Sequence, residues 1–403
     1  MAEARNGRTV SGKGRALRIG IDISTLRPPF TGIANYEVQL VRRLLNLMPE
    51  VSFAGFGVYR WQEVTAEFLS RCVGQELPLA RKKTSSLRYS TLAHRGRNEL
   101  RKWAFATTAE RQKLDLYHAF SYRPPADLSV PVIPVVYDLS TVRHPETHPK
   151  ARLDWLEPLQ RLCEKAPVVH TISEFTAQEI EEHFHIPKDR IVVVPPGVND
   201  LFLNPKAPDL DVLAKLNLRV GAYVLSVATL EPRKNLKTLI KAFAALSEPI
   251  RSTMPLVIVG ARGWGNIDLP GIVDKLTAEG SIRFAGYVSD EDLQSLYAGA
   301  RALFYPSLYE GFGMPITEAL ACGTPVIASS SSSMPEAGGK EARFVAPLDV
   351  DRWRSELEYV AGHNDHLDVA KRLARTAYAR TFSWDRSAEI VKDIYLRVGA
   401  GLR

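Results

Sequence analysis

Two glutamates flank a glycine-rich turn in the last third of the chain. In SLYEGFGMPITEALACGTPVIASS (307–330), Glu310 precedes Gly-Phe-Gly and Glu318 follows it. Proline is favoured in the first turn of a helix, so Pro315 predicts that a helix begins directly after these glycines. Glycine N–H groups can approach a ligand closely, and a helix N-terminus attracts anions. Because carboxylates accept hydrogen bonds from hydroxyls, a diphosphate with a sugar at each end, as in a nucleotide sugar, would satisfy both glutamates.

A purely structural interpretation of these glutamates is also open. Glu310 would then be a surface residue, and Glu318 a first-turn glutamate that the helix dipole favours. The motif alone does not decide between a ligand site and an ordinary helix start.

A basic pair precedes a second predicted helix. In VATLEPRKNLKTLIKAF (227–243), a strand is expected to end at Thr229, and Arg233 and Lys234 lie just before the helix. Cations at a helix N-terminus oppose the dipole unless they complement a bound anion, for which arginine offers a planar fork and lysine a point charge. The alternative is two basic residues in an exposed turn.

Short β-branched segments alternate with helical patterns, which predicts parallel sheets with helices on both faces. The predicted strand segments are 17–23, 51–58, 115–120, 132–139, 167–173, 190–197, 222–230, 255–261, 281–288, 300–307 and 324–330. A proline-rich stretch at 195–212 interrupts the alternation and predicts a linker. The fold class is therefore α/β, with two Rossmann-like doubly wound domains that bind ligands beyond the carboxyl ends of their strands.

The length supports two domains, because 403 residues exceed what one hydrophobic core usually serves. We expect a disordered tail at 1–16, an N-terminal domain at 17–197, a C-terminal domain at 198–382 and a terminal amphipathic helix at 383–403. Three scattered cysteines without C-x-x-C spacing and the lack of a long apolar run predict a cytoplasmic protein with no membrane span.

One segment concentrates the positive charge. Residues 81–113 contain ten Lys or Arg against two Glu, with Leu, Tyr, Trp and Phe between them. This mixture suits an element at an anionic membrane surface, which would make the protein peripheral at the inner face of the cytoplasmic membrane. A solvated helix that packs its apolar residues on the domain is the alternative. Nucleic acid is not the expected partner, because no nucleic-acid-binding module accompanies the charge.

Taken together, these residues resemble the retaining glycosyltransferases of family 4. EGFGMPITEALACGTPVI (310–327) is similar to the Glu-x7-Glu signature of that family. The segments ATLEPRKNL, GYVSDEDL, PGVND, YDLSTVRHPETHP and TISEFT match its other motifs in order and spacing. The resemblance covers residues 17–400 and is closest to mannosyltransferase-like members that build bacterial surface polysaccharides and O-antigen.

The resemblance implies a GT-B fold, in which two Rossmann-like domains face each other across a cleft and the last helix crosses back to the N-terminal domain. It implies that Arg233 and Lys234 bind the diphosphate, that Glu318 binds the ribose hydroxyls and that Glu310 lies beside the transferred sugar. It also implies that the backbone at Val288 contacts the base and that Gly32 belongs to a glycine-rich loop near the phosphates. The implied donor-binding residues are Gly32, Arg233, Lys234, Val288, Glu310, Gly311, Phe312, Gly313, Met314 and Glu318.

The implied catalytic residues are Glu310, His118 and Asp138. His118 and Asp138 fall at predicted strand ends that would face the cleft, where Asp138 would orient the acceptor or contact the sugar. Two positions depart from the family pattern, since Thr229 stands where many members carry arginine and Tyr137 where many carry histidine. Both could alter donor or acceptor preference.

The expected reaction is metal-independent transfer of a hexose, mannose from GDP-mannose, onto a glycan or lipid-linked acceptor. Without a metal, cations and helix N-termini must stabilise the leaving diphosphate. The alternatives are another nucleotide sugar such as UDP-glucose or GDP-rhamnose, an epimerase or phosphorylase of the same fold, and a catalytically silent partner that binds a nucleotide sugar.

Overall fold

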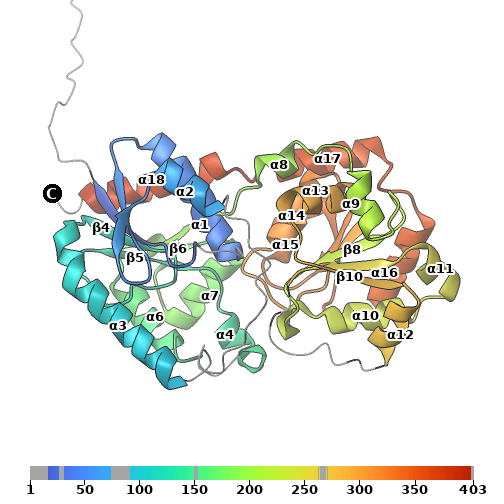
Figure 1. Ribbon diagram of the computed structural model, residues 1–403, viewed down its shortest axis with the longest axis horizontal. Helices are drawn as coiled ribbons and strands as arrows, with labels where there is room; N and C mark the ends of the chain where they lie inside the picture. The colour runs from blue at the N-terminus through green and yellow to red at the C-terminus, as the bar shows by residue number, and fades with distance from the viewer. Residues whose placement is uncertain are drawn as a thin grey trace, which may run out of the picture.

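The chain folds into two halves, each built around a mostly parallel sheet with helices on its faces (Figure 1). The computed structural model describes residues 17–26, 31–73, 91–148, 153–261, 263, 269 and 271–400, without the side chains of 91–95 and 400. The tail expected at 1–16 and the basic residues 81–90 lie outside the described residues.

The N-terminal sheet has the strand order β3-β2-β1-β4-β5-β6-β7. Its strands are β1 (Arg18–Asp22), β2 (Ser52–Phe56), β3 (Trp61–Glu63), β4 (Leu116–Ala119), β5 (Val132–Val136), β6 (Val169–Thr171) and β7 (Ile191–Val193). β3 runs antiparallel to β2, whereas the other pairs are parallel. Every residue of β5 is buried, as expected for a parallel strand covered on both faces.

The C-terminal sheet is parallel, in the order β10-β9-β8-β11-β12-β13. Its strands are β8 (Val224–Val227), β9 (Leu256–Val259), β10 (Ile282–Gly286), β11 (Ala302–Tyr305), β12 (Val326–Ser329) and β13 (Ala342–Val345). This order is that of doubly wound dinucleotide-binding sheets, in which the ligand binds where the strand order reverses. In this sheet that point lies between β8 and β11, and the predicted fold class is confirmed.

The helices of the N-terminal half are α1 (Gly32–Leu47), α2 (Ala66–Val73), α3 (Thr91–Ala109), α4 (Ser140–Arg143), α6 (Leu156–Lys165) and α7 (Glu174–Phe184). Those that follow are α8 (Asp200–Leu203), α9 (Leu210–Lys215), α10 (Leu236–Ala244), α11 (Glu248–Thr253), α12 (Ile272–Ala278), α13 (Asp290–Gly299), α14 (Met314–Ala321), α15 (Met334–Gly338), α16 (Val350–Gly362), α17 (Val369–Ala379) and α18 (Trp384–Ala400). Thr31, Ser173 and Ser289 cap α1, α7 and α13 with their side-chain oxygens. Each helix within the described residues is too short or too polar to cross a bilayer.

The last helix, α18, returns to the N-terminal half and packs on α1 (Figure 1). At its start, Trp384 Nε1 donates to Asn199 Oδ1 at 3.1 Å, and Ser387 Oγ donates to the Pro195 carbonyl at 2.5 Å. The expected division at 197/198 falls between the last strand of the first sheet and the first strand of the second, and it stays a prediction.

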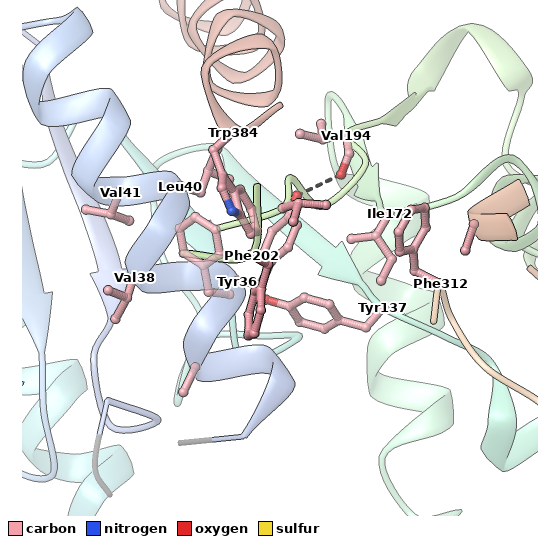
Figure 2. Close-up of a cluster of buried hydrophobic side chains, with 14 of the residues drawn as sticks. Tyr36, Val38, Leu40, Val41, Tyr137, Ile172, Val194, Phe202, Phe312 and Trp384 are labelled. Carbon is pink, nitrogen blue, oxygen red and sulfur yellow. Dashed lines mark hydrogen bonds between the residues drawn. The ribbon is translucent and has the colours of Figure 1, made fainter. Parts of the chain in front are cut away.

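One cluster of buried apolar side chains extends from α1 into the C-terminal half (Figure 2). Tyr36 lies within it, with its ring edge-on to Tyr137 at 5.6 Å between centroids and to Trp384 at 5.4 Å. Phe312, from the Gly-Phe-Gly turn, belongs to the same cluster. The two halves therefore share a core at their boundary.

Every segment predicted as a strand contains one, and two strands were not predicted. β3 is three residues long, WQE, and lies at the sheet edge. β13, ARFV, is also an edge strand, and only its last residue is buried. Neither carries the apolar run that identifies a central strand, which is why the pattern missed both.

Candidate functional site

Arg233 and Lys234 converge on Glu310. A short 3₁₀ turn after β8 carries the two cations, and Glu310 follows β11. Arg233 Nη1 donates to Glu310 Oε2 at 3.0 Å, and Lys234 Nζ donates to Oε1 at 2.7 Å. Because β8 and β11 are neighbouring parallel strands, the two loops meet at the same edge of the sheet. The two separate sequence motifs thus form one group.

Burial strengthens the interactions within this group. The Glu310 side chain is 8% exposed, and those of Arg233 and Lys234 are each 13% exposed. Burial alone raises the pKa of Glu310, yet the nearby ammonium and guanidinium groups outweigh it and lower that pKa to about 2. Burial alone lowers the pKa of Arg233, but carboxylates, above all Glu310 and Asp138, raise it. Arg233 and Glu310 are therefore both charged at neutral pH.

Arg233 retains a donor that the protein does not use. Its Nη1 also donates to the Tyr309 carbonyl at 2.6 Å, and its Nη2 to Glu231 Oε1 at 2.9 Å. Its Nε–H is buried without a partner. A buried donor left unpaired costs about 1–3 kcal/mol, a cost that the oxygen of a bound anion would remove. The guanidinium is therefore incomplete without a ligand.

The glycine turn brings the two halves into contact. A Cβ at Gly311 would lie 2.0 Å from the Tyr137 carbonyl oxygen, so only glycine fits there. Gly313 has φ +105° and precedes the first residue of α14, Met314. A Cβ on Gly32, at the start of α1, would lie 3.1 Å from the Met314 Cε. These predicted site residues are thus brought together from both halves.

Glu318 lies one turn inside α14. Its Oε2 accepts a hydrogen bond from the Tyr297 hydroxyl at 3.0 Å. Burial, and then the carboxylate of Asp290, raise the pKa of Glu318 to about 7 although the tyrosine bond lowers it. Val288 lies just before α13, the helix that carries Tyr297 and Asp290, and is partly buried against the core. Glu318 is thus poised between its charged and neutral forms near neutral pH.

The charge of Asp138, in the N-terminal half, acts on Arg233. Asp138 follows β5, and its Oδ1 accepts hydrogen bonds from the backbone N–H of Ser140 at 2.9 Å and from its hydroxyl at 2.6 Å. The Cβ of Asp138 would lie 3.2 Å from a Cβ built on Gly311. Its charge raises the pKa of Arg233, so the two side chains interact across the domain boundary.

His118 is placed elsewhere, which corrects the expectation that it faces the cleft. It is completely buried inside the N-terminal half. Its Nδ1 is 2.7 Å from the Tyr395 hydroxyl on α18, and its Nε2 is 2.9 Å from His170 Nδ1. His170 Nε2 is in turn 2.7 Å from the Tyr36 hydroxyl. Burial, and then His170, lower the pKa of His118 well below its ordinary value, so the ring is neutral.

Direct hydrogen bonds join the halves beside the site, and no sequence pattern predicted them. Glu336 accepts bonds from the backbone N–H groups of Glu174 at 2.9 Å and Phe175 at 2.6 Å, at the N-terminus of α7. The Tyr309 hydroxyl accepts from the Leu139 N–H at 3.0 Å. A carboxylate from one half thus caps a helix of the other.

Sequence reasoning also missed two buried carboxyl groups in the N-terminal half. Asp22, the last residue of β1, accepts a hydrogen bond from Arg101 at 2.6 Å. Glu37, on α1, accepts one from Thr25 at 2.6 Å, and its other oxygen is buried without a partner. Burial raises the pKa of Glu37 well above its ordinary value. An acidic residue within the apolar pattern of α1 was the available signal.

Comparison with known proteins identifies both halves. Residues 30–200 match the family model "Glycosyltransferase Family 4", and residues 215–379 match "Glycosyl transferases group 1". The chain is 34% identical over 373 residues to "O-antigen chain mannosyltransferase B" from Escherichia coli, covering 89% of this chain and 94% of that protein. It is 29% identical over 292 residues to "Serotype-specific mannosyltransferase WbdA" from Escherichia coli, covering 70% of this chain and about a third, 36%, of that protein.

A solved structure has the same arrangement of domains. Sucrose-phosphate synthase from Thermosynechococcus elongatus superimposes with a TM-score of 0.72 at 20% identity, covering 96% of this chain and 100% of that one. At this identity the likeness concerns the fold, and it confirms the GT-B arrangement predicted from the sequence.

Proposed function

The chain belongs to glycosyltransferase family 4, and from this premise we propose that it is a retaining mannosyltransferase that uses GDP-mannose and a lipid-linked or polysaccharide acceptor. The activity of a glycosyltransferase follows from the family. The sugar is proposed because the relatives named above are called mannosyltransferases, one of them acting on O-antigen chains. We propose the base and the acceptor as well.

The observation that carries the proposal is the group formed by Arg233, Lys234 and Glu310. Its cations lie just before α10, where the helix dipole disfavours positive charge and favours an anion, and Arg233 has a buried N–H without an acceptor. A diphosphate supplies both the charge and the acceptor oxygens. In the structure Glu310 forms ion pairs with both cations, and a bound diphosphate would interact with them alongside Glu310.

Each of the remaining predicted donor-binding residues would contact a different part of the nucleotide sugar. The backbone of Gly311–Met314, at the N-terminus of α14, would line the sugar and the diphosphate. Glu318 would accept hydrogen bonds from the ribose hydroxyls, and Val288 would contact the base through its backbone. Gly32 would let the N-terminal half close on the phosphates, since a larger residue would meet Met314.

The chemistry then rests on stabilising the departing diphosphate. Arg233 and Lys234 place two positive charges where negative charge develops, in a site that is largely shielded from water and needs no metal ion. A diphosphate oxygen would take the proton of the acceptor hydroxyl as the new bond forms on the same face. Asp138 would orient the acceptor, whereas His118, enclosed in the core, would hold the fold.

Peripheral membrane attachment is proposed for α3. Its Phe105 is buried against β2 and β3, whereas Leu100 and Trp103 are 51% and 64% exposed. Arg97 and Lys102 are exposed on the same helix. An outward face that combines an indole, a leucine and cations suits an anionic lipid surface better than a merely solvated helix. Residues 81–90 of the predicted basic segment lie outside the described residues.

Thermal unfolding with nucleotides tests the donor. A ligand at about 100 times its dissociation constant stabilises the folded state by roughly 2.7 kcal/mol, enough to raise the midpoint by several degrees. GDP, UDP, ADP, TDP and their sugar conjugates would be compared on the wild type, on Arg233→Gln and on the exposed control Arg219→Gln. We expect GDP and GDP-mannose to raise the midpoint of the wild type and of the control, and the Arg233 variant to lose the shift.

The other outcomes separate the alternatives. A shift with a different base keeps the glycosyltransferase and removes GDP-mannose. Donor binding without transfer to any lipid-linked or glycan acceptor would favour the silent partner. An Arg233 variant that binds the donor as tightly as the wild type would move the diphosphate away from this group.

A further inference from the structure

A cavity lies at the edge of the C-terminal sheet where its strands begin. It has a volume of about 290 Å³ and is bordered by Pro325 and Ala342, at the beginnings of β12 and β13, and by residues of α16 and α17. The group around Glu310 lies at the opposite edge, where the strands end. The cavity is therefore separate from the proposed donor site, and the proposed function gives it no role.

Five basic side chains line this cavity, against two carboxylates. They are Arg301, Lys340, Arg343, Lys371 and Arg375, with Glu341 and Asp365. Two of the five are neutralised within the protein: both oxygens of Glu356 accept hydrogen bonds from Arg343, at 2.7 and 2.9 Å, and Asp365 accepts one from Lys371 at 2.8 Å.

Two guanidinium groups, those of the partly buried Arg301 and the buried Arg375, keep their charge. Arg301 donates to the carbonyls of Val360 at 2.6 Å, Gly221 at 3.1 Å, Ala361 at 3.1 Å and His363 at 3.0 Å, and to Asn364 Oδ1 at 2.9 Å. Arg375, which is 4% exposed, donates to the Gly323 carbonyl at 2.9 Å and the Asp365 carbonyl at 3.2 Å. These acceptors are uncharged oxygens. They satisfy hydrogen bonds without neutralising the cations, and Arg375 has more N–H groups than its two bonds use.

We infer that this cavity binds a phosphate group carried by a small molecule. The charges of Arg301 and Arg375 and the exposed Lys340 provide the attraction, and a phosphate supplies several acceptor oxygens at once. The volume is near the lower limit of small-ligand sites, which fits a phosphate with a hexose-sized group.

One wall of the cavity offers a surface for the carrier. The rings of Tyr359 and His363 stack at 4.0 Å between centroids with 13° between their planes. The Arg343 guanidinium lies 4.2 Å from the centroid of the Tyr359 ring. The Tyr359 ring is therefore covered on both faces, and the exposed His363 ring that it supports is the flat surface beside the cations. Such a surface suits the sugar of a sugar phosphate, whereas free phosphate would use the cations alone.

Calorimetric titration with inorganic phosphate and with mannose 1-phosphate, at fixed ionic strength, tests the inference. Lys340→Ala/Lys371→Ala removes two exposed cations of the cavity, and Lys188→Ala/Lys215→Ala removes two exposed lysines elsewhere. Both double variants keep every buried arginine, so both are expected to fold. We expect the cavity variant to bind at least tenfold more weakly than the wild type and the matched control to bind like it.

Arg233→Gln distinguishes this site from the donor site. Binding that survives in Arg233→Gln and is weakened in the cavity variant supports the inference, whether or not the donor proposal holds. Tighter binding of mannose 1-phosphate than of inorganic phosphate would show that the aromatic wall contacts the sugar. Equal affinities would show that the cavity recognises the phosphate alone. Equal binding by both double variants, loss of binding in Arg233→Gln, or no binding by the wild type at millimolar concentrations would overturn it.

Discussion

The two halves of the molecule each bury a group of polar side chains, and the two groups differ in how completely their hydrogen bonds are made. In the C-terminal half, Arg233 and Lys234 form ion pairs with Glu310, and one buried N–H of Arg233 has no acceptor. In the N-terminal half, both ring nitrogens of His118 and of His170 have partners, and burial keeps both rings neutral.

This difference separates a site from a structural network. A buried polar group whose hydrogen bonds are complete gains nothing from a ligand, and removing one member leaves another unsatisfied. A group with uncompensated donors gains from an anion. The chain from Tyr395 through His118 and His170 to Tyr36 ties α18 to the first domain, whereas the Arg233 group is open to a donor substrate.

Replacing Glu310 should have the largest effect. Glu310→Gln keeps the shape of the side chain but removes the carboxylate that Arg233 and Lys234 share, so Lys234 loses its ion pair and Arg233 keeps only that with Glu231. We expect transfer to fall by about 10²–10³-fold and the free energy of unfolding to fall by about 3–5 kcal/mol. Initial rates on protein shown to be folded, together with urea unfolding, would measure both. Glu248→Gln, at an exposed position, is the control, and a variant with wild-type transfer rates would contradict the role.

Removing a cation should act on donor binding. A hydrogen bond from a charged group such as Arg233 contributes about 1.5–3 kcal/mol, so we expect Arg233→Gln to lower the affinity for the nucleotide sugar by about 10–100-fold. Direct titration of the donor measures this, with Arg219→Gln as the charge-matched control. Unchanged affinity would mean that the diphosphate binds elsewhere. The Arg233 group would then be a structural network, like that of His118 and His170.

The histidine network should respond in the opposite way. Tyr395→Phe removes the partner of His118 Nδ1 and leaves a buried polar atom unsatisfied. The free energy of unfolding should fall by about 1–3 kcal/mol, whereas the transfer rate per folded molecule should stay within about twofold. Tyr359→Phe, far from this network, serves as the control for loss of a tyrosine hydroxyl. A large loss of turnover without a loss of stability would make the network catalytic.

The same contrast explains what could be predicted from the sequence. Arg233, Lys234 and Glu310 lie in ordered motifs at the ends of neighbouring strands, and parallel topology alone brings such ends together. The position of His118 depends on α18, which comes from the other end of the chain, and no local pattern reports that packing. Glu336 was missed for the same reason, because its partners are backbone groups of α7 that carry no side-chain signature.

Acidity should distinguish the two glutamates of the opening motif. The pKa of Glu310 is lowered to about 2, so it contributes stability above its ordinary pKa and keeps its charge down to strongly acidic pH. The pKa of Glu318 is raised to about 7, so its contribution is present below its ordinary pKa and is lost as the pH rises through 7.

Protonation of Glu318 should therefore weaken donor binding as the pH falls. Between pH 8 and pH 6 most of Glu318 becomes protonated and loses acceptor capacity for the ribose hydroxyls, so we expect affinity to fall by up to about tenfold. The nucleotide sugar is the right probe, because its bridged diphosphate does not titrate in this range. Glu318→Gln should bind weakly at both pH values, and a variant with the wild-type profile would assign the titration to another group.

The smallest expected effect concerns the exposed surface of α3 in the N-terminal half and its binding to membranes. Arg97→Ala removes one exposed cation from α3, and a basic residue near an anionic membrane contributes about 1 kcal/mol. Binding to vesicles that contain anionic lipid should fall by about fivefold in a sedimentation assay, and Lys215→Ala should leave it unchanged. High salt should weaken the wild type in the same way, because exposed charges are screened. If Arg97→Ala and the wild type bind equally, α3 is a solvated helix and the domain meets its acceptor without the membrane.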